Sequence, residues 1–322
     1  MKVTEHYNNT NEPLISFEII PPKRGGSISR VFESLDELNK YKPPFIDVTS
    51  HAAEAYYEEL PDGSVKRYTR RKRPGTIGLC AAIKHRYNVD PVPHLICKGF
   101  TQEETEDALI ELNYLGFENV LAIRGDDIGY QKPIQKTRGI NKYAVDLVRQ
   151  ITRMNSGVYL EKLIDADETD FCIGVGGYPE KHIQAPNLAF DIARLKEKVE
   201  AGADYIVTQM FFDNPGFFRF VELCREAGIE APIIPGLKIL TTPKHLYRLP
   251  EFFHLTIPGA LSREVSSRPD HASEIGVEWA VQQCRELLGY GVPGLHFYVM
   301  GNPDPACRVI DQLDVVPSTS KI

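Results

Sequence analysis

Several common features are missing from this 322-residue sequence. No segment approaches the roughly 18 apolar residues that a membrane-spanning helix requires, and the first residues lack the apolar core of a secretory signal. The six cysteines have no Cys-x-x-Cys spacing and lie mostly in apolar runs, as small core residues do in a reducing compartment. We therefore expect a cytoplasmic protein without a membrane partner.

Concentrated positive charge is scarce as well. The 37 Lys and Arg residues are outnumbered by 44 Asp and Glu residues, which gives a net charge of −7. The one dense basic run is Arg67-Tyr-Thr-Arg-Arg-Lys-Arg73, and a solvated loop explains it better than a nucleic-acid contact. We expect no nucleic-acid partner.

Two kinds of binding motif are also missing. His94 and His182 have no His, Cys or carboxylate at metal-ligand spacing in the sequence, which argues against a metal site. No Gly-x-Gly-x-x-Gly turn joins a strand to a helix, and the nearest cluster, Gly174-Val-Gly-Gly177, lies inside a strand-like run. A doubly wound dinucleotide-binding sheet is therefore only the runner-up fold.

What the chain does contain is an alternation of apolar strand-like runs and amphipathic helical runs. The predicted strands are 14–20, 44–50, 92–97, 119–123, 171–177, 205–211, 232–240 and 294–300. The predicted helices are 29–41, 101–116, 143–154, 187–202, 217–227 and 274–288. This pattern predicts an α/β protein, a (β/α)8 TIM barrel, as a single domain over residues 1–322.

Two segments fit this alternation less simply. The apolar run Thr76 to Ile83 is compatible with the start of a helix or with an extra strand. Residues 52–75 are polar and predict an insertion after the second strand, with a hairpin turn at Pro61-Asp-Gly63.

Polar residues stand in or just after the predicted strands, and the active site of a TIM barrel lies at those carboxyl ends. They are Glu18, Thr49, His94, Arg124, Asp126, Tyr178, His182 and Gln209. Glu18 lies between Phe17 and Ile19, so burial should raise its pKa and suit it to general acid catalysis, unless an Arg near the rim pairs with it. Gln209 offers a donor and an acceptor to a heterocycle, or is a buried amide satisfied by backbone.

A set of strand-end motifs resembles the methylenetetrahydrofolate reductase family. The motifs are Phe17-Glu-Ile-Ile-Pro-Pro22, Asp47-Val-Thr49, Pro93-His-Leu95, Leu121-Ala-Ile-Arg-Gly-Asp126, Tyr178-Pro-Glu-x-His182, Lys198-x-x-x-Gly-Ala203, Thr208-Gln-Met-Phe-Phe-Asp213, Ile233-Ile-Pro-Gly236 and Leu295-His-Phe-Tyr298. The resemblance implies an FAD-dependent barrel enzyme that reduces 5,10-methylenetetrahydrofolate to 5-methyltetrahydrofolate. Its hydride source would be NADH or NADPH in a ping-pong reaction that supplies methionine synthesis, and a homo-oligomer is compatible with it.

The resemblance also implies roles for individual residues. Glu18 would be the general acid for the folate, Asp126 would tune the flavin and stabilise the folate cation, and Gln209 and His245 would contact substrate. The positions that would hold FAD are Thr49, Ser50, Ala52, His94, Arg124, Gly125, Asp126, Tyr143, Ala144, Tyr178, His182, Asp191, Arg194 and Lys198. Arg194 and Lys198 are one helical turn apart and suit a diphosphate.

Some positions depart from the family pattern. Ser50 stands where a Tyr is usual, Gly301-Asn302-Pro303 where an Arg is common, and His245 where a folate-contacting Gln is expected. Two other functions stay open. One is a flavin-free barrel lyase or aldolase, for which Lys238 is the only strand lysine able to form a Schiff base, and the other is a folate- or flavin-binding protein without turnover.

Overall fold

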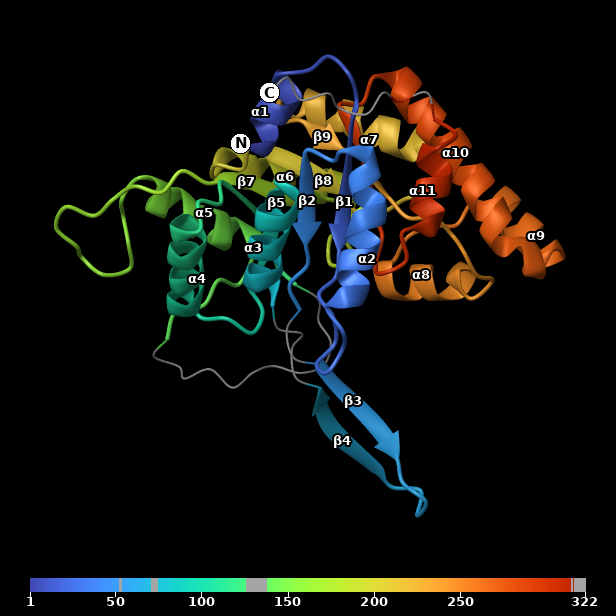
Figure 1. The fold of residues 1–322 in the computed structure, drawn as a ribbon, viewed down its shortest axis with the longest axis horizontal. Coiled ribbons are helices and arrows are strands. Elements are labelled where there is room, and N and C mark those ends of the chain that lie inside the picture. The colour runs from blue at the N-terminus through green and yellow to red at the C-terminus, as the bar shows by residue number, and fades with distance from the viewer. Residues whose placement is uncertain (52–53, 71–74, 126–137, 314, 316–322) are drawn as a thin grey trace.

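A parallel sheet forms the centre of the molecule (Figure 1). The computed structural model describes residues 1–51, 54–70, 75–125, 138–313 and 315. Within these residues the sheet has nine strands, paired in the order β10-β11-β1-β2-β5-β6-β7-β8-β9. The strands are β1 (Leu14–Ile19), β2 (Phe45–Val48), β5 (Asp90–Ile96), β6 (Asn119–Ile123), β7 (Cys172–Gly177), β8 (Tyr205–Thr208), β9 (Ile233–Ile234), β10 (Gly236–Leu237) and β11 (Gly294–Tyr298).

The sheet closes on itself through β9 and β10. These two short strands lie on either side of Pro235, and β9 pairs with β8 while β10 pairs with β11. The carbonyl of Pro235 accepts a hydrogen bond from the backbone N–H of His296 at 3.1 Å, so the pairing continues across the interruption. The two pieces act as one barrel strand, and the predicted (β/α)8 barrel is confirmed. A doubly wound sheet would have kept two open edges.

Helices follow the strands around the barrel (Figure 1). They are α1 (Val3–Asn8), α2 (Ser29–Leu38), α3 (Thr76–Tyr87), α4 (Gln102–Tyr114), α5 (Ala144–Asn155), α6 (Leu188–Glu200), α7 (Asn214–Glu226), α8 (His245–Phe253), α9 (Gly259–Ser267), α10 (Ala272–Tyr290) and α11 (Asp304–Ile310). All six predicted helices are present, and the run beginning at Thr76 is a helix. The helices α1, α8, α9 and α11 were not predicted from the sequence.

Two helix starts show how local sequence sets these boundaries. In α4 the Thr101 hydroxyl accepts from the N–H of Glu104 at 3.1 Å, and the Glu104 carboxylate accepts from the N–H of Thr101 at 2.8 Å. This reciprocal pair is the capping box that the sequence predicts. The Asn187 side chain caps α6 in the same way by accepting from the N–H of Phe190 at 2.8 Å.

Alternation along the strands separates two of the three hydrophobic clusters of the described residues. On β1, Phe17 and Ile19 belong to the large cluster between the sheet and its surrounding helices. Phe45, Val92 and Tyr205 belong instead to a smaller cluster that also contains Val3 of α1. Because α1 packs at the amino ends of the strands, the carboxyl ends are left for polar side chains.

The insertion after β2 is an antiparallel hairpin of β3 (Glu54–Glu59) and β4 (Val65–Arg70), which projects away from the barrel (Figure 1). Its turn closes with hydrogen bonds from Leu60 N–H to the Ser64 carbonyl and from Gly63 N–H to the Leu60 carbonyl, each 2.8 Å. Gly63 has a φ of +77°, a conformation that glycine adopts without strain. The hairpin predicted at this turn is confirmed.

Two further expectations concern the chain as a whole. Each cysteine lies in the described part of the chain, none of them forms a disulfide, and five of the six are buried. In that same part, no helix combines the length and apolar character needed to cross a membrane.

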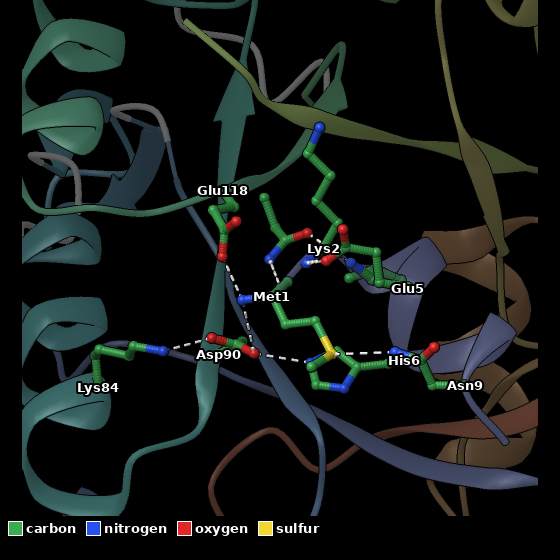
Figure 2. Close-up of polar contacts among 10 residues, drawn as sticks. Met1, Lys2, Glu5, His6, Asn9, Lys84, Asp90 and Glu118 are labelled. Carbon is green, nitrogen blue, oxygen red and sulfur yellow. Dashed lines mark hydrogen bonds and ion pairs between the residues drawn. The ribbon is translucent and has the colours of Figure 1, made fainter.

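A network of charges fixes α1 to the amino end of the barrel (Figure 2). The Asp90 carboxylate, at the start of β5, accepts from His6 Nε2 at 2.8 Å and from Lys84 Nζ at 2.5 Å. The Met1 amino group lies 3.3 Å from Asp90 and also contacts Glu118. Burial alone would raise the pKa of Asp90, but the hydrogen bonds from His6 and Lys84 lower it to about 2.

We expect Asp90→Asn to lower the free energy of unfolding at pH 7 by on the order of 1–2 kcal/mol, after allowing for solvent screening. The folded pKa lies below the unfolded value of about 3.9, so the stabilisation is complete above pH 4 and is lost as the pH falls through about 2. Urea denaturation at pH 7, 4 and 3 measures this dependence.

Asp170→Asn is the matched control, because the Asp170 carboxylate pairs with Lys2 at 2.5 Å but is 86% exposed. Its effect should stay within about 0.5 kcal/mol. Equal losses in the two variants would contradict the role assigned to the Asp90 network.

Candidate active site

Three protonatable side chains meet inside the carboxyl end of the barrel, and we call them the acid–histidine cluster: Glu18, Asp47 and His94. Strand register places Glu18 directly beside Asp47, since the two residues are paired across β1 and β2. His94 comes from β5, the next strand. Its Nε2 lies 3.2 Å from Asp47 Oδ2 and 3.7 Å from Glu18 Oε2.

Glu18 is the most accessible carboxyl of this cluster, with a side chain that is 15% exposed. Burial raises the pKa of Glu18 to about 7, with a further increase from Asp47, while His94 and Lys238 oppose the change. The raised pKa expected from its position between two apolar residues is confirmed. At neutral pH this carboxyl therefore keeps a proton for much of the time, as a general acid requires.

Asp47 is fully buried, and burial raises its pKa to about 7 while His296 opposes the increase. Its Oδ1 has no hydrogen-bond partner among the described residues. His296, on β11, is equally buried and its Nδ1 lies 2.9 Å from the Ser16 hydroxyl. Asp47 and His296 were not among the predicted site residues, although a carboxylate within the apolar run Phe45-Ile-Asp-Val48 was the available signal.

Lys238 faces the acid–histidine cluster from the segment after β10. Its ammonium donates to the carbonyl of Tyr298 at 2.9 Å, and burial lowers its pKa to about 8 while Glu18 opposes the change. Burial lowers the pKa of His245, and the charge of Lys238 lowers it further, which indicates that the two side chains are near one another. The structure thus brings two predicted substrate contacts, Glu18 and His245, near Lys238.

Gln209 follows β8 at the same end of the barrel. Its Oε1 accepts from the N–H of Met210 at 2.9 Å, which occupies one acceptor position. The neighbouring Thr208 carbonyl accepts from the Tyr298 hydroxyl at 2.6 Å. Gly236 lies against both partners of this hydrogen bond. A Cβ at position 236 would lie 2.1 Å from the Thr208 oxygen and 2.6 Å from the Tyr298 ring, so only glycine fits there.

A second group, which we call the cationic cluster, lies over β6, β7 and α6 and consists of Arg124, His182 and Lys198. Burial lowers the pKa of His182, and Arg124 and Lys198 lower it further, so the three groups are near one another. Asp191 opposes that change, and its carboxylate accepts from the backbone N–H of His182 at 2.8 Å.

Aromatic rings border the cationic cluster. The guanidinium carbon of Arg124 lies 5.4 Å from the centre of the Tyr143 ring, next to Ala144 at the start of α5. Arg124 also donates to the side chain of Gln184. The rings of Tyr178 and His182 meet edge to face with their centres 4.8 Å apart.

Lys198 is the unusual member of this group. Its ammonium donates to the carbonyl of Gly176 at 2.5 Å, and burial lowers its pKa to about 8 while Asp191 opposes the change. A buried ammonium beside an arginine favours an anionic ligand such as a diphosphate. Arg194 differs from Lys198, because its guanidinium is exposed and donates to Glu197 at 2.6 Å.

A cavity of about 210 Å³ opens beside the acid–histidine cluster, between the ends of β2 and β5 and the starts of α3 and α4. Ser50 and His94 line it together with the N-terminus of α3. Thr49 adjoins this wall, since its carbonyl accepts from the Thr76 hydroxyl at 2.9 Å and its own hydroxyl lies 3.3 Å from His51 Nδ1.

Two of the predicted site residues, Ala52 and Asp126, lie outside the described residues, so their roles stay predictions. Gly125 precedes Asp126 with a φ of +83°, which favours glycine at the end of β6. In the described part of the chain, no three His, Cys, Asp or Glu side chains are arranged to hold a metal ion.

Comparison with known proteins gives a family match over nearly the whole chain. The family model described as methylenetetrahydrofolate reductase matches residues 2–314. Methylenetetrahydrofolate reductase (NADH) 1 of Arabidopsis thaliana is 31% identical over 98% of this chain and 51% of that protein. Methylenetetrahydrofolate reductase 2 of Saccharomyces cerevisiae is 29% identical over 100% of this chain and 51% of that protein.

A bacterial relative is covered more fully. The 5,10-methylenetetrahydrofolate reductase of Escherichia coli is 28% identical over 94% of this chain and 91% of that protein. The chain thus spans about half the length of the plant and yeast relatives and most of the bacterial one.

Solved structures share the barrel at much lower identity. A Clostridium thermocellum protein that binds two copies of 5-methyl-5,6,7,8-tetrahydrofolic acid has a TM-score of 0.55 at 12% identity, covering 96% of this chain and 99% of that one. Oxaloacetate acetylhydrolase has a TM-score of 0.51 at 10% identity, covering 97% and 83%. At such identities the likeness concerns the fold alone.

The buried ammonium of Lys198 predicts a gain in stability when it is removed. Its folded pKa lies below the unfolded value, so at pH 7 the charge costs stability, and the cost disappears as the pH rises through about 10.4. We expect Lys198→Met to raise the free energy of unfolding of the cofactor-free protein at pH 7 by about 1–2 kcal/mol. Chemical denaturation at pH 7 and pH 10 measures the effect.

Lys196→Met on the same helix is the control, because the Lys196 ammonium is exposed and lies 3.8 Å from Glu200. It should leave the stability almost unchanged. A cofactor-free Lys198→Met protein that is less stable than wild type would show that Lys198 supports the fold and not a ligand.

Proposed function

The chain belongs to the methylenetetrahydrofolate reductase family, and we propose that it reduces 5,10-methylenetetrahydrofolate to 5-methyltetrahydrofolate with NADH or NADPH, using bound FAD. One observation in the structure carries this proposal. It is the largely buried carboxyl of Glu18, with its raised pKa, at the carboxyl end of β1. This reaction belongs to one-carbon metabolism and supplies the methyl group for methionine synthesis.

Glu18 would act on the folate. Its protonated carboxyl gives a proton to N10 of the folate, and the bond between N10 and the bridging methylene carbon breaks with its electron pair left on N10. The folate then carries a cationic carbon–nitrogen double bond at N5, which accepts hydride. Glu18 afterwards takes up a proton from solvent, to which its side chain is partly exposed.

The residues of the cationic cluster fit FAD. Bound FAD would carry hydride from the nicotinamide to the folate. Lys198 would meet the diphosphate, whose negative charge offsets the cost of the buried ammonium. Arg124, Tyr178 and His182, which follow β6 and β7, and Tyr143 at the start of α5 would hold the remainder of the cofactor.

The remaining predicted residues would orient the reactants. Gln209 stands at the end of β8 and His245 at the start of α8, from where they would hydrogen-bond the pterin or the nicotinamide. Asp126 would place a negative charge beside the cation that forms on the folate. In the sequence it directly follows Arg124 and Gly125 after the β6 run, which supports this role.

A flavin-free lyase is the second candidate, and Lys238 is the observation that favours it. Its lowered pKa, next to the carboxyl of Glu18, suits an amine that forms a Schiff base. Against this, the ammonium is already engaged by the Tyr298 carbonyl, and membership of the reductase family favours the redox reaction.

We expect the purified protein to be yellow, with close to one FAD per chain. NADH or NADPH should bleach the flavin under anaerobic conditions, and 5,10-methylenetetrahydrofolate should restore its colour. Lys198→Met should lose most of the bound FAD while the control Lys196→Met keeps it. A colourless protein that fails to take up added FAD would contradict the proposal.

The two half-reactions should respond differently to Glu18→Gln. Folate reduction should fall by about 10²- to 10⁴-fold, since the amide cannot supply a proton. Flavin reduction by NADH or NADPH needs no acid and should persist within a few fold. Stopped-flow absorbance of the flavin measures both rates.

Glu33→Gln, at an exposed position of α2, controls for the loss of a carboxylate and should leave both rates unchanged. FAD content and melting temperature are measured for each variant. Equal losses in the two half-reactions of Glu18→Gln would mean that Glu18 organises the pocket instead of donating a proton.

A further inference from the structure

We propose that Asp47 is a positioning residue that keeps the catalytic proton on Glu18, acting both through His94 and by its own charge. The inference rests on the proposed function, because it concerns the acid that would open the folate ring. Asp47 itself has no route to a substrate, since its side chain is fully buried beneath Glu18 and His94.

The geometry links the three residues of the acid–histidine cluster through one nitrogen. His94 Nε2 approaches both Asp47 Oδ2, at 3.2 Å, and Glu18 Oε2, at 3.7 Å. A proton on that nitrogen is held by the closer carboxylate, so Asp47 selects the Nε2–H tautomer and orients the ring. The ring edge toward Glu18 is then fixed.

The fold alone gives little reason for a carboxylate at this position. Asp47 is 0% exposed, and one of its oxygens has no hydrogen-bond partner among the described residues. An asparagine of nearly the same shape would offer His94 the same carbonyl acceptor without the cost of burying a charge. A carboxylate at this position therefore implies a use for its charge.

That charge acts on Glu18, its neighbour across β1 and β2. Two carboxyls this close resist being ionised together, so they release their protons in two separate steps. When Asp47 is ionised and Glu18 gives its proton to the folate, the pair becomes doubly charged for a moment. The repulsion favours rapid uptake of a new proton from solvent, which restores the acid for the next turnover.

Other titratable groups surround this pair and modify its charge. Two of these groups come from β11. His296 favours the ionised form of Asp47, and Tyr298 has its own pKa raised by burial and then by Glu18 and Asp47. Lys238, after β10, favours ionised Glu18. Among the described residues, Tyr7 of α1, Cys80 of α3 and Tyr205 of β8 also lie near Asp47, and their own pKa values are raised by burial first and then by Asp47. These groups do not supply a second carboxylate to replace Asp47.

The test compares the pH dependence of folate reduction in wild type and Asp47→Asn. In the FAD-loaded proteins, the rate of flavin reoxidation by 5,10-methylenetetrahydrofolate is measured by stopped flow from pH 5.5 to pH 9. We expect the loss of rate with rising pH to begin about one unit lower in the variant. The rate should thus be about tenfold lower at pH 8 and similar to wild type near pH 5.5.

A second readout does not depend on turnover. Carboxyl carbons of glutamate are labelled with ¹³C, and Glu18 is assigned by the signal missing from Glu18→Gln. Titration of the protein should show the Glu18 midpoint at lower pH in Asp47→Asn than in wild type. If wild type fails to reduce folate, the proposed function fails, while this titration still decides the role of Asp47.

Asp204→Asn is the matched control, because Asp204 is another carboxyl whose pKa is raised by burial, at the opposite end of the barrel. Its pH profile and Glu18 midpoint should equal those of wild type. An unchanged profile and midpoint in Asp47→Asn would overturn the inference. A pH-independent loss in both half-reactions would also overturn it, since that result indicates a structural role only.

Discussion

Closure of the parallel sheet is the constraint on which the rest of this molecule depends. Once β9 and β10 join β8 to β11, every second side chain of each strand must face an interior from which water is largely excluded. At the amino end that interior is filled by apolar side chains and α1. At the carboxyl end it holds Glu18, Asp47 and His94, whose charges are then governed by one another and not by solvent.

Stability and function compete at this carboxyl end. Lys198 and Lys238 both have pKa values lowered by burial, which means that each ammonium costs folding free energy at neutral pH. The network around Asp90 at the opposite end has the opposite effect on folding free energy. Its hydrogen bonds favour the charged carboxylate, so this charge stabilises the fold at neutral pH. The barrel thus concentrates its unfavourable charges where an anionic ligand or a reacting substrate would use them.

Much of the fold could be predicted from the sequence. The continuous apolar run of β6 and the capping box of α4 are local signals that agree with the barrel. Short elements were missed for a physical reason. The helix α8 has Pro250 in its interior and α9 has no side-chain cap, so packing against the barrel decides their conformation more than local propensity does.

The candidate site was predictable only in part. Strand ends were enough to find Glu18 and His94, because their carboxyl-end positions follow from the strand pattern. They could not reveal that His94 lies between Glu18 and Asp47, since this depends on the strand register across β1, β2 and β5. The ion pairs of the site residues could not be predicted from the sequence either. Arg194 was expected to act together with Lys198 from the same helical face, but its guanidinium pairs with Glu197.

The proposed chemistry requires Glu18 to carry a proton for much of the time at neutral pH. Infrared difference spectroscopy between wild type and Glu18→Gln would observe this proton directly, as a protonated carboxyl C=O band present only in wild type. We expect this band to be strong at pH 6 and to decline through pH 7 to 8. A band that is already absent at pH 6 would contradict it, because Glu18 would then be an ordinary ionised carboxylate.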